Sequence, residues 1–448
     1  DYLSKEDEEL FRTTTPMTRM IKVSPFEYAD KSQMKDYVLE EITARYPAET
    51  ETTEGDMSWQ EFMELGRNFK GEYLAPVDPD RAVFGAYTSG STGISKLVIH
   101  SSANIVATAY QMSIFIPPSD VQEVWWTPIL PPALIAVTVS MTIFPLSTGL
   151  MVSLDPFCPL ENIDIEFMDR KPNFWALIPL YCEMLMSSER IPEDYDMSHL
   201  RTIGAGAEAM NDRKYAEVEE FFHKHNVQAK LSAGYGQSEG CSNFTLPNPM
   251  FPLEDGCVGM PMTATVLGVF DKDLNELNYG ESGELCMTGP SMMLHYSGWR
   301  GEELTEQTLV EHPDGNTWLH TGDEAYITEQ GIVHILGRGE IKAYGDKPLH
   351  VMRMETKTVR TPGVKDGFFC LVPDQEHEGY YRPYLFVILD GTKTLEEVAE
   401  LLKDTLEEHE YPVEIREITE RPYFHFKTDR KGLTAQILEE LEQAKEEK

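Results

Sequence analysis

The order of strand-like and helix-like segments constrains the fold of this chain most strongly. Apolar strand-like runs such as residues 96–100 alternate with amphipathic helical runs such as residues 210–225, up to about residue 255. From there to residue 340 the pattern is mostly strand-like, with a strand at residues 264–270 and turn signals at Asp314-Gly315 and Gln330-Gly331. This order predicts an α/β fold in which βα subdomains are followed by a β-rich subdomain.

Residues 341–448 form a smaller pattern of their own. Strand-like segments at 367–372 and 384–389 precede a helix at about 394–408, and a charged helix is expected from about residue 433 to the C-terminus. We therefore expect a large domain over residues 1–340 and a small, mobile α+β lid domain over residues 341–448.

Composition excludes several classes of partner and cofactor. A formal net charge of -38 leaves no broad basic face for nucleic acid or an anionic membrane. The six cysteines are scattered and form no C-x-x-C pair. We therefore expect a reducing, cytoplasmic setting and no structural zinc.

One apolar stretch, residues 129–152, is long enough to be compared with a membrane span. It contains three prolines and Gly149, which disfavour a single continuous helix. A buried helix of about ten residues from Ala133, followed by a strand over residues 149–154, explains the stretch better, so no membrane span is expected.

A turn rich in glycine, serine and threonine, residues 87–96, is the first candidate binding element. Gly90 and Gly93 allow backbone conformations closed to other residues and a close approach to a ligand. The hydroxyl groups and exposed N–H groups of the turn can donate to phosphate oxygens, and Lys96 adds a positive charge. The spacing is not that of a Walker loop, so the turn predicts phosphate binding outside that class of NTPase.

Further segments follow this turn in a fixed order. They are Gly204 to Glu208, Gly234 to Glu239, Thr321 to Asp323 with Gly337 and Arg338, and Phe426 to Arg430. Together with the turn they resemble the motifs of the adenylate-forming superfamily, which includes acyl- and aryl-CoA synthetases, luciferases and the adenylation domains of peptide synthetases. The resemblance runs from about Asp78 to the C-terminus and is closest in style to the acyl-CoA synthetases.

The resemblance implies a two-step activation of a carboxylic acid. The carboxylate attacks the α-phosphorus of ATP, pyrophosphate leaves, and a thiol, commonly that of coenzyme A, then attacks the acyl-adenylate. Positioned cations and hydrogen-bond donors would stabilise the charge that develops in both steps. The implied cofactors are ATP and Mg²⁺, with coenzyme A as co-substrate.

The same resemblance gives roles to individual residues. Glu239 corresponds to the Mg²⁺-binding glutamate, which supplies the hard oxygen that this ion prefers. Tyr235 corresponds to the aromatic residue that stacks on adenine, and Asp323 to the acid that accepts both ribose hydroxyls. The nucleotide-binding residues implied elsewhere, phosphate turn included, are Thr88, Ser89, Gly90, Ser91, Thr92, Gly93, Lys96, Gly206, Ala207, Glu208, Ser238 and Arg338.

Lys427 corresponds to the C-terminal lysine that carries the first half-reaction in the family. There the lysine contacts the carboxylate and α-phosphate oxygens during adenylation and leaves when the small domain rotates. The residues that follow it, Thr428 to Lys431, support the match. Lys427, Glu239 and Lys96 are therefore the expected catalytic residues.

Several positions depart from the family pattern. Ser95 and Leu97 stand where proline and glycine usually flank the loop lysine, and Phe426 stands where glycine usually precedes the catalytic lysine. The spacing after Arg338 is shorter than usual, which leaves Glu340 as the hinge candidate. Only 87 residues precede Thr88, so the N-terminal part is expected to be shortened.

The acid substrate is the least constrained part of the prediction. Residues 125–134 occupy the region where amino-acid-activating relatives usually carry an aspartate and many CoA ligases a histidine, and this segment has neither. An apolar acyl or aryl acid is therefore favoured over an amino acid. Trp175, Ile178, Tyr181 and Met184 lie nearby in sequence, and most of them are expected to be core residues.

Three functions remain open from the sequence. The first is an acyl- or aryl-acid CoA ligase of fatty-acid-type metabolism. The second is a stand-alone adenylation enzyme that loads a carrier protein supplied by another chain. The third is a catalytically weakened homologue that binds a ligand, which the retention of Lys96, Glu239 and Asp323 argues against.

Overall fold

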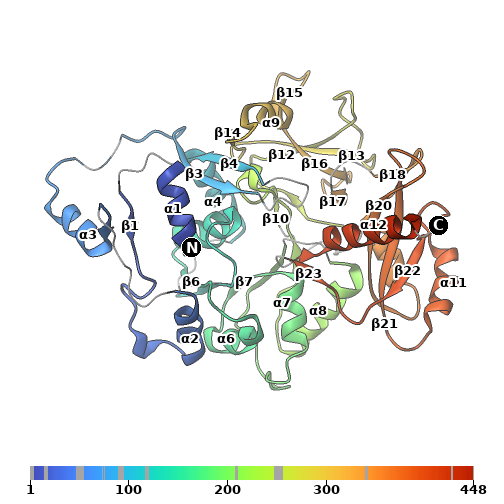
Figure 1. Cartoon of the computed structure of the whole chain (residues 1–448), viewed down its shortest axis with the longest axis horizontal. Coiled ribbons are helices and arrows are strands. Elements are labelled where there is room, and N and C mark those ends of the chain that lie inside the picture. Colours follow the sequence, from blue (N-terminus) through green and yellow to red (C-terminus); the bar gives the residue numbers. More distant parts are fainter. Residues whose placement is uncertain are drawn as a thin grey trace.

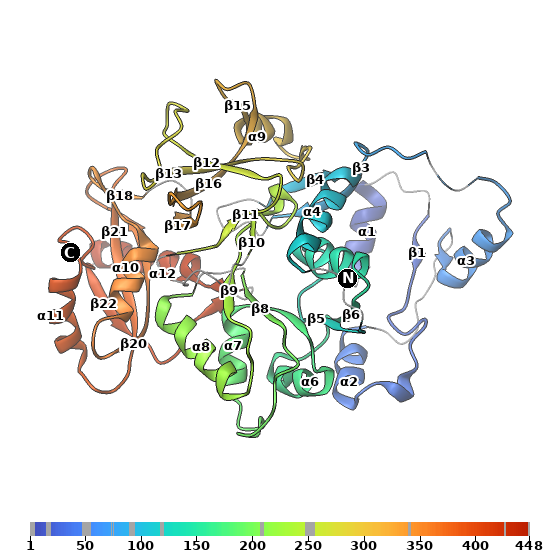
Figure 2. The same ribbon diagram turned by 180° about the vertical axis from the view of Figure 1, so that it is seen from behind.

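A five-stranded parallel sheet with the order β6-β5-β7-β8-β9 lies at the centre of the molecule (Figures 1 and 2). The computed structural model describes residues 5–14, 19–46, 55–72, 74, 76–88, 95–116, 121–206, 210–246, 256–338, 342–424 and 427–446. The central strands are β5 (Val124–Pro128), β6 (Met151–Asp155), β7 (Phe174–Leu177), β8 (Thr202–Ala205) and β9 (Leu231–Ala233). The chain passes from β5 to β6 on one side and to β7 on the other, and open α/β sheets bind ligands beyond the carboxyl ends of strands at such a switch point.

Helices cover both faces of this sheet because neighbouring residues of a strand point to opposite faces. Trp125 and Phe174 pack on one face, and Trp126 and Trp175 pack on the other. The first face is covered by α4 (Ser102–Phe115), the π-helix η2 (Ala136–Ile143) and α5 (Phe144–Ser147). The second is covered by α6 (Ile163–Arg170), α7 (Pro179–Met186) and α8 (Asp212–Lys224).

The apolar stretch at residues 129–152 folds as a helix followed by a strand, as predicted. The helix begins at Ala136 rather than Ala133, is π-helical to Ile143, and continues as α5, which contains Pro145. The strand is β6. In the part of the chain that the structure describes, no helix is long and apolar enough to cross a membrane.

The region after residue 255 is β-rich, as expected. Its main sheet has the order β12-β13-β16-β15, with β17 paired to β16. These strands are β12 (Val266–Phe270), β13 (Gly283–Thr288), β15 (Leu309–Glu311), β16 (Thr317–Ile327) and β17 (Val333–Arg338). A second sheet joins β14 (His295–Ser297) to the hairpin of β3 (Ala82–Tyr87) and β4 (Leu97–Ser101), which flanks the phosphate turn.

The C-terminal part has a sheet and cores of its own. The sheet β20-β21-β22 separates one apolar cluster that contains Phe369 and Leu402 from another that contains Phe368 and Ile437. The elements are β18 (Ala343–Tyr344), β19 (Lys347–Pro348), α10 (Val351–Val359), β20 (Val364–Pro373), β21 (Tyr381–Leu389), α11 (Leu395–Thr405), β22 (Glu414–Glu417), β23 (Tyr423–Phe424), β24 (Lys427–Thr428) and α12 (Arg430–Glu446). Each strand and helix expected here is present within a few residues, and the domain boundary after residue 340 stays a prediction.

The N-terminal elements lie beside the central sheet, with α3 and β1 outermost (Figure 1). Lys35, at the start of α2, donates to Glu166 of α6 over 2.8 Å and so joins this part to the large domain. The elements are α1 (Lys5–Thr14), β1 (Ile21–Lys22), α2 (Asp36–Arg45), β2 (Met57–Ser58) and α3 (Trp59–Asn68). The remaining elements between residues 245 and 310 are β10 (Thr245–Leu246), β11 (Met260–Pro261) and α9 (Gly301–Thr308).

Candidate active site

Lys96 closes the base of the hairpin that carries the phosphate turn. Its backbone N–H donates to Thr88 Oγ1 over 3.0 Å, and the Thr88 N–H donates to the Lys96 carbonyl over 2.9 Å. These two hydrogen bonds hold Thr88 and Lys96 opposite each other at the base of the hairpin. Residues 89–94 lie outside the described residues, so the predicted roles of Ser89, Gly90, Ser91, Thr92 and Gly93 stay predictions.

Tyr296 joins the two predicted catalytic groups of this region. Lys96 Nζ donates to the Tyr296 hydroxyl over 3.0 Å, and that hydroxyl donates to Glu239 Oε1 over 2.6 Å. Lys96 Nζ lies 3.7 Å from the same carboxylate oxygen. Burial, and then the nearby Glu239 charge, raise the pKa of Tyr296 well above its ordinary value, so the phenol keeps its proton and remains a donor.

The Glu239 carboxylate has the chemistry that a hard divalent cation requires. Its Oε1 accepts from Tyr296, and among the residues that the structure describes none donates to Oε2. The side chain is only 10% exposed and lies beside the lysine of the phosphate turn. An oxygen ligand without a hydrogen bond, adjacent to a phosphate-binding element, fits the Mg²⁺ that the family implies.

The segment that carries Glu239 depends on two glycines. A Cβ at Gly236 would lie 1.7 Å from the Ser242 carbonyl oxygen, and one at Gly240 would lie 1.6 Å from the Phe244 ring. The backbone therefore folds back on itself too closely for any side chain at either position. His100 fixes the same segment from β4, since its Nε2 donates to the Ser238 carbonyl over 2.7 Å.

Tyr235, Gln237 and Asp323 form a second polar group at the other end of this segment. The Tyr235 hydroxyl donates to Asp323 Oδ2 over 2.6 Å, and the Gln237 amide donates to the same oxygen over 2.8 Å. The Gln237 amide also donates to the Thr321 carbonyl over 2.9 Å, and the Asp323 N–H to Thr321 Oγ1 over 3.1 Å. Asp323 is 3% exposed. Its carboxylate thus accepts from two residues of the segment after β9.

The sequence profile of the family described as AMP-binding enzyme matches residues 17–297, more than half of the chain. The chain belongs to the AMP-binding enzyme family. The resemblance to adenylate-forming enzymes that the five motifs carry is thereby confirmed.

Curated relatives in the family are similar to the chain over part of their length. It is 26% identical over 320 residues to a long-chain-fatty-acid–CoA ligase of Escherichia coli O157:H7, covering 69% of this chain and 54% of that protein. It is 25% identical over 339 residues to 4-coumarate–CoA ligase 2 of Nicotiana tabacum, covering 72% of this chain and 58% of that protein. The chain thus spans about half the length of the curated relatives it matches.

Solved structures confirm the fold. ATP-bound MatB from Rhodopseudomonas palustris superposes with a TM-score of 0.73 at 20% identity, over 96% of this chain and 81% of that chain. An O-succinylbenzoate CoA synthetase of Bacillus subtilis, in complex with ATP and magnesium, gives 0.63 at 20% identity, over 82% and 72%. The α/β fold class predicted from the sequence is therefore correct.

The predicted site residues lie in three places. The first polar group contains Lys96, Tyr296 and Glu239, the second contains Tyr235, Gln237 and Asp323, and a further motif lies at the carboxyl edge of the central sheet. Lys96 and Glu239 lie together, and Tyr235 lies with Asp323. Gly206 follows β8, where its N–H donates to the Leu177 carbonyl over 3.1 Å, and the Gly234 N–H donates to the Ala205 carbonyl over 3.2 Å. Both glycines thus lie at the carboxyl edge of the central sheet. Ala207, Glu208, Glu340, Phe426 and the Arg338 side chain lie outside the described residues, although the Arg338 backbone pairs with Asp323.

The family lysine, Lys427, lies on the short β23–β24 hairpin. Phe424 and Lys427 are cross-strand partners in this hairpin. The Tyr423 hydroxyl donates to Glu183 Oε2 of α7 over 3.0 Å, which fastens the hairpin to the large domain. In Figure 1 the hairpin lies next to α7, between the C-terminal part and the central sheet.

The aromatic residues near the predicted acid site are core residues, as expected for most of them. Trp126, Trp175, Ile178 and Tyr181 are at most 3% exposed, and the Tyr181 hydroxyl donates to the Pro128 carbonyl over 3.0 Å. Ile129, directly after β5, has a φ of 64°, which is strained for a β-branched residue. This strain lies at the switch point of the sheet, the place where open α/β sheets generally bind ligands.

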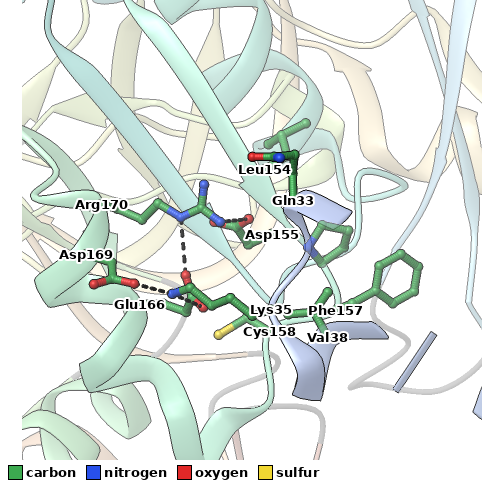
Figure 3. Close-up of a pocket in the computed structure, with 11 residues that line it drawn as sticks. Gln33, Lys35, Val38, Leu154, Asp155, Phe157, Cys158, Glu166, Asp169 and Arg170 are labelled. Carbon is green, nitrogen blue, oxygen red and sulfur yellow. Dashed lines mark hydrogen bonds and ion pairs between the residues drawn. The ribbon is translucent and has the colours of Figure 1, made fainter. Parts of the chain in front are cut away.

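A cavity of about 520 Å³ lies at the carboxyl end of β6, between α2 and α6 (Figure 3). Its two cations are both paired with acids. Arg170 contacts Asp155 over 2.8 Å, and Lys35 contacts Glu166 over 2.8 Å and also Asp169. Because these charges are already neutralised, the cavity offers no net positive site for a phosphate or carboxylate.

Two functional side chains were missed by sequence reasoning. Tyr296 comes from β14, 57 residues after Glu239, and Gln237 occupies the variable position of a family motif. Only the hydrogen bonds of the folded chain identify them. The motif Gly234 to Glu239 contained a weak signal for Gln237, because its neighbours Tyr235 and Glu239 both carry predicted roles.

Proposed function

We propose that the chain activates an apolar carboxylic acid with ATP and transfers the acyl group to coenzyme A. In the first step a carboxylate oxygen attacks the α-phosphorus, the bond to the bridging oxygen breaks, and pyrophosphate leaves with that electron pair. In the second step the sulfur of the thiol attacks the acyl carbonyl, AMP leaves, and the thiol proton passes to solvent or base. Family membership supports the reaction class.

One observation carries the proposal: a single short segment joins the two polar groups. Tyr235 and Glu239 are four residues apart, and they contact Asp323 and the Lys96–Tyr296 pair respectively. A nucleoside triphosphate needs a carboxylate for its ribose at one end, and a cation and a metal ligand for its phosphates at the other. The segment from Tyr235 to Glu239 contacts groups suited to both ends of the nucleotide, and Gly236 and Gly240 fix the conformation of its backbone.

The residues of the chain take complementary parts in this reaction. Asp323, held by Tyr235 and Gln237, would accept the ribose hydroxyls and set the distance to the phosphates. Lys96 would stabilise negative charge on the β- and γ-phosphates, and Glu239 would hold the Mg²⁺. When bound, this ion supplies charge neutralisation of the pyrophosphate leaving group. Because the ribose and phosphate contacts share one rigid segment, the α-phosphorus would be presented in one orientation.

Lys427 would complete the site for the first step only. Its ammonium group would contact the attacking carboxylate and an α-phosphate oxygen, and reduce the repulsion between two anions. A lysine on a small hairpin can leave with the lid, whereas the other groups lie on the large domain. This arrangement supports a lid that serves adenylation in one position and thioester formation in another.

The acid is proposed to be an uncharged acyl or aryl acid. The walls near the carboxyl ends of β5 and β7 are apolar, and residues 125–134 include neither aspartate nor histidine. The curated relatives named above act on long-chain fatty acids and on 4-coumarate, as their names state. All six cysteines are buried and none of them forms a disulfide bond, which fits a reducing compartment.

The test is release of pyrophosphate from ATP and Mg²⁺ with a panel of fatty, aryl and amino acids, with and without coenzyme A. We expect release with an apolar acid, and continuous turnover only when coenzyme A is present. Turnover with a carrier protein but not with coenzyme A would show that a carrier protein, and not coenzyme A, accepts the acyl group. Nucleotide binding without release for any acid would overturn the proposal in favour of a ligand-binding homologue.

A further inference from the structure

Two histidines and a cysteine converge in the main sheet of the β-rich region, outside the site described above. Cys286 of β13 and His320 of β16 are directly opposite each other in the antiparallel pair, and His312 follows β15. Their ligand atoms all lie within 4.8 Å of one another, and the two Nε2 atoms are 2.9 Å apart. Nitrogen ligands on one tetrahedral zinc ion are about 3.3 Å apart, so only small shifts separate this arrangement from a coordination sphere.

The hydrogen bonds of His320 leave its Nε2 with a lone pair that a metal ion can use. His320 Nδ1 lies 2.9 Å from Glu284 Oε2, and since a carboxylate only accepts, Nδ1 carries the proton and Nε2 is bare. The 2.9 Å contact between the two Nε2 atoms then requires His312 Nε2 to carry the proton that it donates to His320, and a metal ion would displace this proton. A neutral imidazole whose other nitrogen donates to a carboxylate is the usual form of a metal-bound histidine.

The cluster is largely shielded from solvent. Cys286 and His312 are at most 3% exposed, and the rings of His312 and Phe270 pack in a T-shaped arrangement with centroids 4.5 Å apart. Trp318 packs on the same cluster. A simple hydrogen bond between two histidines would need neither a thiol nor a carboxylate beside it, whereas a metal centre uses all four groups.

We propose that Cys286, His312 and His320 bind a divalent, borderline-soft transition metal ion such as Zn²⁺, with Glu284 as the partner that orients His320. Two imidazoles and one thiolate suit this class of ion and not Mg²⁺. The fourth position is left for a solvent molecule, because both Glu284 oxygens are engaged, Oε1 by the Gly322 N–H over 3.0 Å. The inference is independent of the proposed ligase activity.

This site revises the expectation of no structural zinc. That expectation rested on the missing C-x-x-C pair, but the ligands here come from two strands and a turn that only the folded sheet brings together. Through Glu284 the site is also joined to Gly322, which precedes the proposed ribose ligand Asp323. Because a metal ion binds the thiolate form of cysteine, metal binding at Cys286 displaces a proton and weakens as the pH falls.

The test is titration of the metal-free full chain with Co²⁺, followed by its visible and near-ultraviolet absorption. We expect one Co²⁺ per chain with tetrahedral ligand-field bands and a thiolate-to-cobalt charge-transfer band, both removed by added Zn²⁺. Cys286→Ala should abolish the charge-transfer band, and His312→Asn should weaken Co²⁺ binding at least tenfold. The matched controls Cys158→Ala and His377→Asn should behave as the unchanged chain does.

The outcomes are decisive even if one variant is unstable. Circular dichroism establishes folding, and if Cys286→Ala does not fold, His312→Asn decides, because His312 lies in the turn between β15 and β16. Absence of the charge-transfer band in the folded, unchanged chain would overturn the proposal. A band that survives both substitutions would overturn it equally, since the thiolate would then belong to another cysteine.

Discussion

At the scale of single residues, the Tyr296 hydroxyl lies between two opposite charges. It accepts from Lys96 and donates to Glu239. Without it, the lysine and the carboxylate, now 3.7 Å apart, can pair directly, and each would then be withdrawn from the phosphates and the metal ion.

Tyr296→Phe should therefore lower pyrophosphate release and raise the Mg²⁺ concentration needed for half-maximal rate. A hydrogen bond to a charged group contributes about 1.5–3 kcal/mol, which corresponds to about a 10- to 100-fold loss. The rate is measured across a Mg²⁺ titration. Tyr279→Phe, at a tyrosine that is 66% exposed, is the control and should change neither quantity. An unchanged Mg²⁺ dependence in Tyr296→Phe would refute the role.

Asp374 makes the stability of the C-terminal part depend on pH. Burial alone would raise its pKa, but the Glu376 N–H and the Arg382 guanidinium outweigh burial and lower the pKa to about 2. A depressed carboxyl pKa contributes stability that is present above the unfolded value and is lost as the pH falls from about 4 to about 2.

Asp374→Asn should lower the free energy of unfolding by about 2 kcal/mol at neutral pH, and by progressively less as the pH falls below about 4. Chemical unfolding of the variant and the unchanged chain at several pH values measures the difference. Asp404→Asn, at an exposed position of α11, should show no such trend. A difference that stays constant with pH would contradict the assignment.

At the scale of elements, the segment from Gly234 to Gly240 holds the site together. Ala at position 236 would place a methyl group against the Ser242 carbonyl, so the backbone must move. Gly236→Ala should cost about 1–3 kcal/mol of stability and reduce ATP affinity more than tenfold, because both polar groups shift. Calorimetry measures both. Gly66→Ala in α3, where nothing lies within 4 Å, is the control and should be neutral or slightly stabilising. Normal ATP affinity in a folded Gly236→Ala would contradict this.

The sequence predicted elements better than it predicted contacts. The alternation around β4, α8 and β12 was correct because period and turn residues are local properties. Lys96, Glu239 and Asp323 could be proposed as site residues from the sequence because their motifs are contiguous. Tyr296 and the Cys286–His312 cluster were missed because their partners are distant in sequence and meet only through strand pairing. The π-helical form of residues 136–143 was missed because apolar periodicity does not distinguish helix types.

For the molecule as a whole, we propose that the C-terminal part acts as a lid whose Lys427 serves adenylation and not thioester formation. Lys427 lies on a hairpin that Tyr423 fastens to α7, while the nucleotide groups lie on the large domain. Lys427→Ala should abolish adenylate formation and spare thiolysis of a supplied acyl-adenylate, each followed by its own product. Lys431→Ala, an exposed lysine nearby, should leave both intact. Equal loss of both half-reactions would refute the division of labour.

The central claim is that the two polar groups bind ATP for attack by a carboxylate. Exchange of radiolabelled pyrophosphate into ATP, without coenzyme A, tests it most directly because exchange reports reversible adenylation alone. We expect exchange that requires an apolar acid and Mg²⁺ and is lost in Glu239→Gln. If the folded protein binds ATP but shows no exchange with any acid, the two polar groups do not bind ATP for attack by a carboxylate.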